Sequence, residues 1–264
     1  MIDLKDCTLI IPVRFDGPDR FRNVDIVLNY VSKFCDTNFL ICEHDDETKI
    51  KPEYLEIPNV KHLFIPTTDA LFYKTKCIND AVKQIETPFF AIYDADVIMP
   101  PEQYEHTINA LRNARMDIVY PYDGNFLNVP IFTIGKIRRE LDTSFINQHH
   151  CKPGFGMPEL NTNKGSVGGC VFFNKESFIE GGMMNENMIS YGPEDAEVFW
   201  RFRALDYKLH RVSGPLYHLT HARGLNSGES HPNAEKNHEE FQLIMRLDKE
   251  DLKAYVATWK WTKE

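Results

Sequence analysis

Short apolar runs alternate with amphipathic segments through the first 120 residues, and this alternation constrains the fold more than any other feature of the sequence. The runs predicted to be strands lie at residues 8–13, 39–42, 60–65, 89–93 and 117–121. Between them, apolar residues recur at helical spacing over residues 21–34, 76–85 and 101–113. Strands that alternate with helices predict the α/β class, with a doubly wound, mostly parallel central sheet flanked by helices.

The second half of the chain is less regular. Residues 142–168 are rich in turn-forming residues, and no repeat, low-complexity tract or linker separates the two halves. Further strands are expected at 168–173, 209–212 and 216–221, and further helices at 194–205 and 233–247. A length of 264 residues suits one large domain. We therefore expect a single compact domain over residues 1–264.

Charge and cysteine usage exclude several classes of protein. The net charge of −9 disfavours nucleic acid as a partner, because proteins that follow a phosphate backbone carry a basic face. No two of the six cysteines have CxxC spacing, so a zinc ribbon is not supported and reduced thiols are expected. The N-terminal apolar run is short and preceded by acids, unlike a signal peptide. We expect a cytoplasmic protein, and peripheral attachment to the inner face of a membrane stays open.

Two carboxylates follow the fourth predicted strand, in the segment Tyr93-Asp94-Ala95-Asp96. Arg14 follows the first strand, and ligands of doubly wound sheets bind beyond the carboxyl ends of strands. Mg²⁺ and Mn²⁺ prefer oxygen ligands and commonly bridge carboxylates to phosphates. The pair therefore suggests a cation and phosphate site, and a solvent-exposed turn is the simpler alternative.

Three other pairs of residues carry weaker signals. Glu194 and Asp195 open a predicted helix, where the helix dipole favours acids in any case and where a carboxylate beside a cleft can act as a general base. His218 and His221 can share a metal with a carboxylate, or can be ordinary hydrogen-bonded histidines. The third pair, near another helix start, is Lys74 and Lys76. These two lysines can contact a diphosphate, or can be ordinary exposed residues.

The order of these motifs resembles that of the GT-A glycosyltransferases, above all the β-1,4-galactosyltransferase-like group and its bacterial polysaccharide-synthesising relatives. The segments that carry the resemblance are IPVR, FYKTKCIN, YDADV, GGCVFFNKESF, YGPEDAEVFWRF and HLTHAR. They fall within residues 8–225, with 120–165 unmatched. The resemblance implies a GT-A fold and a hexosyl- or N-acetylhexosaminyltransferase of polysaccharide biosynthesis. It also implies a nucleotide-sugar donor (a UDP-sugar is expected), a glycan or glycolipid acceptor, and Mn²⁺ or Mg²⁺ as cofactor.

The resemblance also implies roles for individual residues. Residues expected to bind the donor are Pro12, Val13, Arg14, Phe72, Lys74, Lys76, Asp94, Asp96 and Gly169, with Asn79 and Gly168 in the same motifs. The metal ligands are expected to be Asp96, His218 and His221. The acceptor is expected to lie against Tyr191 and Glu194, and Asp195 is expected to be the catalytic base beside Glu194. Tyr191 and Pro193 stand where the family has tryptophan and glycine, so the identity of the acceptor does not carry over.

The resemblance divides the domain into functional parts. Residues 1–120 are expected to form the nucleotide-sugar-binding half, residues 121–232 the acceptor-binding and metal-completing half, and residues 233–264 a C-terminal helix. We expect inversion in one displacement, with Asp195 taking the proton of the acceptor hydroxyl while a metal neutralises the leaving diphosphate.

Two alternatives to a glycosyltransferase were weighed. A sugar-phosphate nucleotidyltransferase normally has a Gly-rich basic loop after the first strand, whereas the segment Phe15-Asp16-Gly17-Pro18-Asp19 has one glycine and two acids. A non-catalytic module that binds glycans or nucleotides would bind these ligands without turnover.

Overall fold

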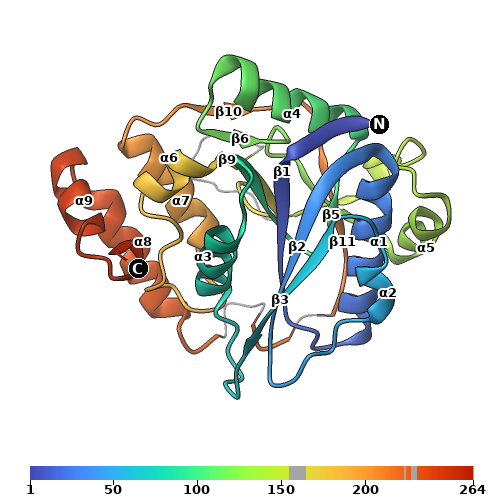
Figure 1. Cartoon of the computed structure of the whole chain (residues 1–264), viewed down its shortest axis with the longest axis horizontal. Helices are drawn as coiled ribbons and strands as arrows, with labels where there is room; N and C mark the ends of the chain where they lie inside the picture. The colour runs from blue at the N-terminus through green and yellow to red at the C-terminus, as the bar shows by residue number, and fades with distance from the viewer. Residues whose placement is uncertain (155–164, 223, 227–230, 264) are drawn as a thin grey trace.

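The computed structural model describes residues 1–154, 165–222, 224–226 and 231–263. Within these residues, a seven-stranded sheet is flanked by helices, and a four-stranded sheet lies beside it (Figure 1). The strands in spatial order across the large sheet are β10 (Leu209–Arg211), β6 (Ile118–Tyr120), β9 (Cys170–Asn174), β4 (Phe89–Tyr93), β1 (Ile2–Val13), β2 (Cys35–Asp45) and β3 (Val60–Pro66).

The large sheet is mostly parallel, as the sequence predicts. Strand β1 pairs in parallel with β2 and β4, and β2 with β3. The exception is β9, which runs antiparallel to both β4 and β6. The carboxyl ends of β1 and β4 therefore lie at one edge of the sheet, together with the start of β9.

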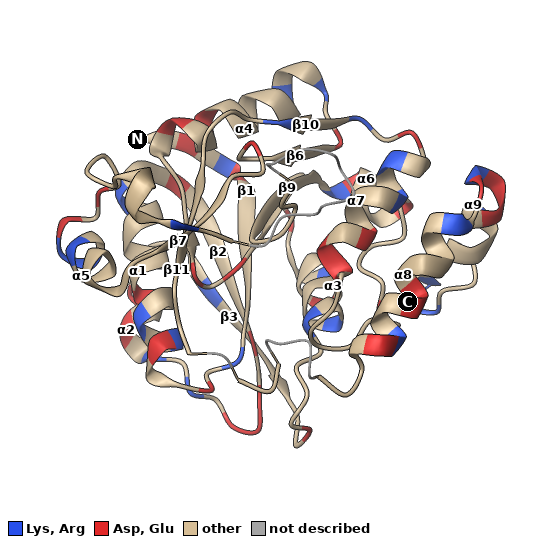
Figure 2. Cartoon of the chain, turned by 180° about the vertical axis from the view of Figure 1, so that it is seen from behind, with Lys and Arg blue, Asp and Glu red and all other residues tan. Residues whose placement is uncertain are grey.

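Helices cover the sheet on two sides. Helices α1 (Pro18–Phe34), α2 (Pro52–Leu55) and α5 (Ile131–Glu140) lie on one side, and both views agree on this (Figures 1 and 2). The helices on the opposite side are α3 (Lys74–Gln84), α6 (Lys175–Glu180), α7 (Glu194–Ala204), α8 (Ala234–Arg246) and α9 (Lys249–Val256). The remaining helix, α4 (Pro101–Ala114), begins with proline at its first position, where the missing N–H has no helical partner to lose.

The four-stranded sheet is the main feature that the sequence did not predict. Its strands are β5 (Val97–Ile98), β11 (Leu216–Leu219), β7 (Phe126–Val129) and β8 (Lys152–Pro153). Only β11 was expected; β5 and β8 have two residues each, too few to show periodicity. In this sheet His218 of β11 pairs with Val97 of β5. The pairing brings His218 next to Asp96, from which it is separated by more than a hundred residues in sequence.

The core forms around β1, whose residues Leu9, Ile10 and Ile11 are fully buried. Packing against it, the rings of Phe90, Phe173 and Phe178 stack or meet edge to face. All six cysteines are buried and free, so they pack as small apolar residues.

The C-terminal segment differs from the single helix expected over 233–264. It contains α8 and α9, followed by a 3₁₀ turn at Trp261–Lys263. A new helix starts at Lys249 because the Asp248 carboxylate accepts hydrogen bonds from the N–H groups of Glu250 and Asp251.

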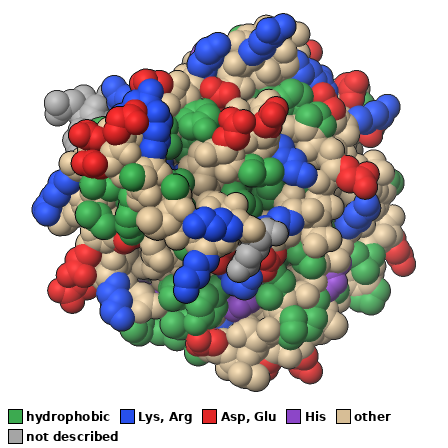
Figure 3. Space-filling view, turned by 60° about the vertical axis from the view of Figure 1, so that its left-hand side comes forward, with side chains coloured by type: hydrophobic (Ala, Val, Ile, Leu, Met, Phe, Trp, Pro, Cys, Tyr) green, Lys and Arg blue, Asp and Glu red, His purple; other side chains and the backbone are tan. Residues whose placement is uncertain are grey.

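Acidic, basic and apolar side chains are interspersed on the face shown in Figure 3. Among the described residues, no helix combines the length and hydropathy that a membrane crossing requires. Part of the expected loop over 142–168, residues 155–164, lies outside the described residues.

Candidate active site

A cavity of about 630 Å³ opens at the carboxyl ends of β1 and β4. Its lining contains almost all of the residues that the sequence predicted for the site. They are Pro12, Val13, Arg14, Phe72, Lys74, Asp94, Asp96, Gly168, Gly169, Tyr191, Glu194, Asp195, His218 and His221. Motifs spread over more than two hundred residues therefore meet in one place.

Two residues of the expected donor motif do not line this cavity. The ammonium of Lys76 lies 2.9 Å from Asp80 on the outer side of α3, because residues two apart on a helix point about 200° apart. Asn79 is fully buried, and it holds the loop of Met184 through a hydrogen bond to the carbonyl and one from the N–H, at 3.0 and 2.9 Å. Lys74 is thus the basic residue that α3 presents to the cavity.

The segment from Asp94 to Asp96 is tied to two other strands. The N–H of Asp94 donates to the carbonyl of Gly169 at 2.8 Å, and the carbonyl of Asp96 accepts from the N–H of Leu219 at 2.7 Å. The two carboxylates then face different partners. Asp96 lies among Arg20 and the two histidines, whereas Asp94 contacts Lys74.

Asp96, His218 and His221 form a candidate metal centre. Their ligand atoms all lie within 4.8 Å of one another. The Nε2 atoms of His221 and His218 lie 3.1 and 3.7 Å from the oxygens of Asp96. One carboxylate and two imidazoles are a donor set that divalent metals such as Mn²⁺ and Zn²⁺ accept.

Hydrogen bonds orient both imidazoles for metal binding. His218 donates from Nδ1 to the amide oxygen of Asn128 at 2.7 Å, and His221 donates from Nδ1 to the carbonyl of Ala222 at 2.7 Å. Because carbonyl oxygens only accept, Nδ1 carries a proton in each ring, which leaves Nε2, on the side of Asp96, as the nitrogen that can bind a cation. Outer hydrogen bonds of this kind accompany metal-ligating histidines, so the residues fit a divalent cation.

Charge at the candidate metal centre is balanced within the protein. Burial would raise the pKa of Asp96, but the hydrogen bond with His221 and the charges of His218 and Arg20 hold it well below its ordinary value. Burial lowers the pKa of His218, which favours the neutral ring. The hydrogen bond with Asp96 raises the pKa of His221, so a cation there competes with a proton.

Arg20 is a site residue that the sequence reasoning missed. Its Nη1 lies 2.6 Å from Asp96 and 3.3 Å from Nε2 of His221. It lies in the first turn of α1, directly after the strand that ends in Val13. That position at the ligand-binding edge is the signal that could have identified it.

A second charged cluster contains the two acids that open α7. The ammonium of Lys74 lies 3.1 Å from Asp94, 3.3 Å from Glu194 and 3.9 Å from Asp195. Burial would lower the pKa of Lys74, but these carboxylates raise it well above its ordinary value. Burial raises the pKa of Glu194, and it raises the pKa of Asp195 to about 7, against the opposing effect of Lys74. The carboxyl group of Asp195 can therefore accept a proton near neutral pH.

The absence of a side chain at Gly168 leaves space for the Asp195 carboxylate. A Cβ at Gly168 would lie 2.6 Å from Oδ2 of Asp195, so a larger residue would displace the carboxylate. The carbonyl of Gly168 accepts a hydrogen bond from the hydroxyl of Tyr122 at 2.7 Å. The next residue, Gly169, has φ of +85°, a conformation that other residues rarely adopt.

Comparisons with known proteins agree with this arrangement. A family model described as the N-terminal domain of galactosyltransferase matches residues 158–223, which include Gly168, Glu194, Asp195, His218 and His221. The chain also superimposes on TarS of S. aureus (residues 1–349) with a TM-score of 0.61 at 12% identity, covering 94% of this chain and 68% of that one. GalNAc-T7 with UDP, GalNAc and Mn²⁺ gives a TM-score of 0.59 at 14% identity, with 91% and 48% covered.

The chain has the fold of the GT-A glycosyltransferases.

This GT-A fold confirms the predicted architecture, and the family match supports the prediction of a glycosyltransferase. A third structure, the catalytic domain of Drosophila β1,4-galactosyltransferase 7 with xylobiose, gives a TM-score of 0.45 at 14% identity. The match covers 78% of this chain and 63% of that domain, so the chain spans less than two thirds of its length. Curated protein sequences give no significant match.

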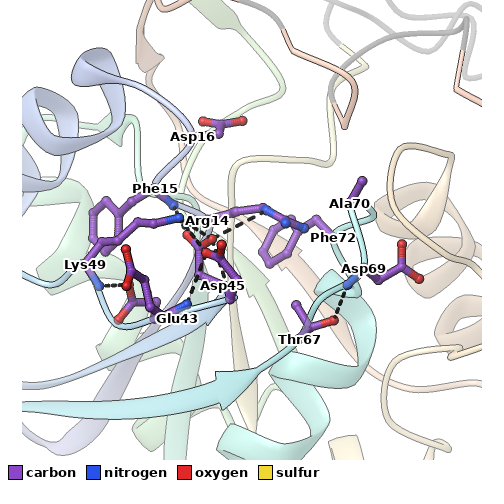
Figure 4. Close-up of polar contacts among 12 residues, drawn as sticks. Arg14, Phe15, Asp16, Glu43, Asp45, Lys49, Thr67, Asp69, Ala70 and Phe72 are labelled. Carbon is purple, nitrogen blue, oxygen red and sulfur yellow. Dashed lines mark hydrogen bonds and ion pairs between the residues drawn. The ribbon is translucent and has the colours of Figure 1, made fainter.

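A network of polar contacts lies at the end of β1, beside the cavity. Arg14 donates from Nη1 to the carbonyl of Leu71 at 3.0 Å, and its Nε lies 3.9 Å from the buried carboxylate of Asp45 (Figure 4). Asp45 also accepts from the N–H of Phe15 at 3.1 Å and from Lys49 at 2.6 Å. These hydrogen bonds and ion pairs therefore join the ends of β1 and β2 to the loop before α3, beside Phe72.

The loop that leads into α7 is fixed from the far end of the chain. The side chain of Asn237 donates to the carbonyls of Ile189 and Tyr191 at 2.9 and 2.8 Å, and accepts from the N–H of Ile189 at 3.1 Å. A Cβ at Gly192 would lie 2.7 Å from this amide. Helix α8 thus holds Tyr191 at the cavity, a function of the C-terminal segment that its sequence did not indicate.

Proposed function

We propose that this protein is a metal-dependent glycosyltransferase that moves a sugar from a nucleotide-sugar donor, most simply a UDP-sugar, to a hydroxyl of a glycan acceptor. The observation that carries this proposal is the position of the segment from Asp94 to Asp96. It lies between the candidate metal centre and the acids of α7, within one cavity. The structural neighbour GalNAc-T7, whose structure contains UDP, GalNAc and Mn²⁺, supports the same choice of donor and cation.

In the proposed donor complex, Asp96, His218 and His221 hold the cation. Such a cation supplies positive charge to the diphosphate that leaves. Arg14 and Phe72 also line the cavity, and we assign the nucleotide to these two residues. Arg20, whose guanidinium already contacts Asp96, provides a further positive group beside the diphosphate.

In the proposed acceptor complex, Asp195 is the base. Its carboxylate takes the proton of the acceptor hydroxyl, the hydroxyl oxygen bonds to the anomeric carbon, and the bond from that carbon to the diphosphate breaks. One displacement of this kind inverts the configuration. Glu194 supports binding of the acceptor, because its Oε2 is buried and has no hydrogen-bond partner among the described residues. A buried carboxylate oxygen of this kind is suited to a hydroxyl of the ligand.

The test is hydrolysis of a panel of UDP- and GDP-sugars by the purified protein, with Mn²⁺ and then with EDTA. We expect slow release of the nucleotide from one donor, at least tenfold faster with Mn²⁺ (about 1.4 kcal/mol in barrier). The matched control is Asp206→Asn, which changes an exposed acid just beyond α7. Absence of both turnover and metal-dependent nucleotide binding would contradict the proposal. Metal-dependent binding without any turnover would instead indicate a binding module.

A further inference from the structure

We propose that Lys74 is a positioning residue for the acceptor side of the reaction. Through direct ion pairs, Lys74 holds the carboxylates of Glu194 and Asp195 in place and keeps them ionised. The resemblance assigned Lys74 to the donor diphosphate, and the geometry points elsewhere. This inference rests on the proposed function, because it takes Asp195 as the base.

The first support is the set of groups around the ammonium. Its nitrogen lies within 4 Å of carboxylates from three segments, Asp94 after β4 and both Glu194 and Asp195 on α7. Asp94 and Glu194 lie within hydrogen-bond distance of this ammonium, and Asp195 is an ion-pair partner at the longer distance of 3.9 Å. Only 14% of the side chain is exposed, so water contributes little to its solvation. A phosphate would therefore have to compete with three carboxylates for Lys74.

The second support is that two other cations of the cavity, Arg14 and Arg20, are engaged elsewhere. Arg14 contacts Leu71 and Asp45, and Arg20 contacts Asp96 and His221. Among the described residues, Lys74 is the cation that forms ion pairs with Glu194 and Asp195. Its removal would leave three neighbouring carboxylates without a positive partner, an arrangement that disfavours ionisation of at least one.

The third support is the position of Lys74 on its helix. Lys74 is the first residue of α3, and the first turn of α3 contains no acid. A cation there is opposed by the positive end of the helix dipole, so helix stability does not explain it. The carboxylates contributed by other elements do explain it.

The fourth support is that α3 is fixed to the segment that precedes α7. The hydroxyl of Thr75 donates to the carbonyl of Met188 at 2.9 Å, and Asn79 holds Met184 and Glu186. The backbone that carries Lys74 and the backbone that leads to Glu194 therefore form one packed unit. This limits the freedom of Lys74 to move toward a phosphate.

The pH dependence follows from the groups that face Asp195. The charged groups are Lys74 from α3, Glu194 from α7 and Asp94 from the end of β4, and of them only Lys74 lowers the pKa of Asp195. The phenols of Tyr120 and Tyr122, at the end of β6, also interact with Asp195, and they stay neutral because burial raises their pKa values. Without the ammonium, the pKa of Asp195 rises above the value of about 7 that it has with Lys74 present. A base works only when ionised, so the acidic limb of the rate profile should move to higher pH.

The experiment compares Lys74→Met and Lys74→Arg with Lys83→Met, which changes an exposed lysine at the other end of α3. Two quantities are measured for each variant: the pH profile of turnover, and the affinity for UDP with Mn²⁺ by calorimetry. For Lys74→Met we expect the acidic limb to move up by about one pH unit or more, while the UDP affinity changes less than about threefold (tenfold equals 1.4 kcal/mol). In Lys74→Arg the acidic limb of the pH profile should lie close to that of the wild type, and Lys83→Met should match the wild type.

The opposite result would overturn the inference. An unchanged pH profile with UDP binding weakened about tenfold or more (1.4 kcal/mol) would make Lys74 a diphosphate contact. If Lys74→Met does not fold, the double variant Lys74→Met/Glu194→Gln is used instead, because it removes one buried charge of each sign. A ¹³C NMR titration of the aspartate carboxyls, with Asp195 assigned from Asp195→Asn, reads the same shift without turnover. An unshifted titration would overturn the role of Lys74, whereas absence of turnover in the wild type would count only against the proposed function.

Discussion

Helix α7 carries two charged clusters one turn apart, and they differ in how completely their polar atoms are paired. In the first, Glu197 and Arg201 are fully buried, and both carboxylate oxygens accept from the guanidinium, at 2.5 and 3.1 Å. The guanidinium also donates to the carbonyls of Gly181 and Met183. Every charged group of this pair therefore has its partners inside the protein.

The second cluster, at the start of the same helix, is incompletely paired. Glu194 and Asp195 share the ammonium of Lys74 with Asp94, and Oε2 of Glu194 has no hydrogen-bond partner in the part of the chain that the structure describes. Buried polar atoms without partners are rare in proteins and call for an explanation. The difference teaches that burial of charge on α7 serves structure where pairing is complete, and serves ligand binding where it is not.

The strongest way to test this contrast is Asp195→Asn. If Asp195 is the base, turnover should fall by about 10²- to 10⁴-fold, because general base catalysis contributes roughly that factor. The measurement is the rate of sugar transfer or donor hydrolysis at pH 8, together with UDP affinity, which should stay near that of the wild type. Full activity in this variant would exclude Asp195 as the base.

The complementary change is Arg201→Leu. It leaves the Glu197 carboxylate buried without a cation, and breaking a buried pair in this way costs about 3–5 kcal/mol of unfolding free energy. Chemical denaturation measures the loss, and the double variant with Glu197→Leu should recover part of it. A loss below about 1 kcal/mol, the range of exposed ion pairs, would contradict a structural role for this pair.

A smaller effect is expected at the candidate metal centre from Asn128→Ala. The amide oxygen of Asn128 fixes the ring of His218, and loss of such an outer hydrogen bond typically weakens metal binding about 10- to 100-fold. Titration with Mn²⁺ followed by electron paramagnetic resonance measures this affinity. Asn29→Ala, an exposed position on α1, is the control. Equal affinities in the two variants would argue against a metal at His218.

The smallest expected effect is a gain in stability from Asp195→Asn at pH 8. The folded protein holds the pKa of Asp195 at about 7, above the value of about 4 in an unfolded chain. Between these values the folded state binds a proton that the unfolded state has lost, so this group lowers stability as pH rises through that window. Asparagine avoids the loss, and the unfolding free energy should be higher by about 1 kcal/mol or more. The gain should vanish at pH 4, and a gain that persists there would have another cause.

The sequence by itself determined the parts of this protein that depend on local patterns. The alternation of apolar runs and amphipathic segments predicted the parallel strands β1 to β4 with α1, α3 and α4, because burial of a strand or helix face imposes a period on the chain. The order of motifs indicated Asp96, His218 and His221 together, and the structure places their ligand atoms within 4.8 Å.

The tertiary structure decided what depends on contacts between distant residues. Arg20 and Asp96 are 76 residues apart, and Asn128 and His218 are 90 apart, so no local pattern joins either pair. The short strands of the second sheet set the position of His218. The pairing of β4 with β9 and the packing of α3 and α7 direct Asp94 to Lys74, away from Asp96. A motif of two acids gives the residue types, and only packing decides which cation each carboxylate meets.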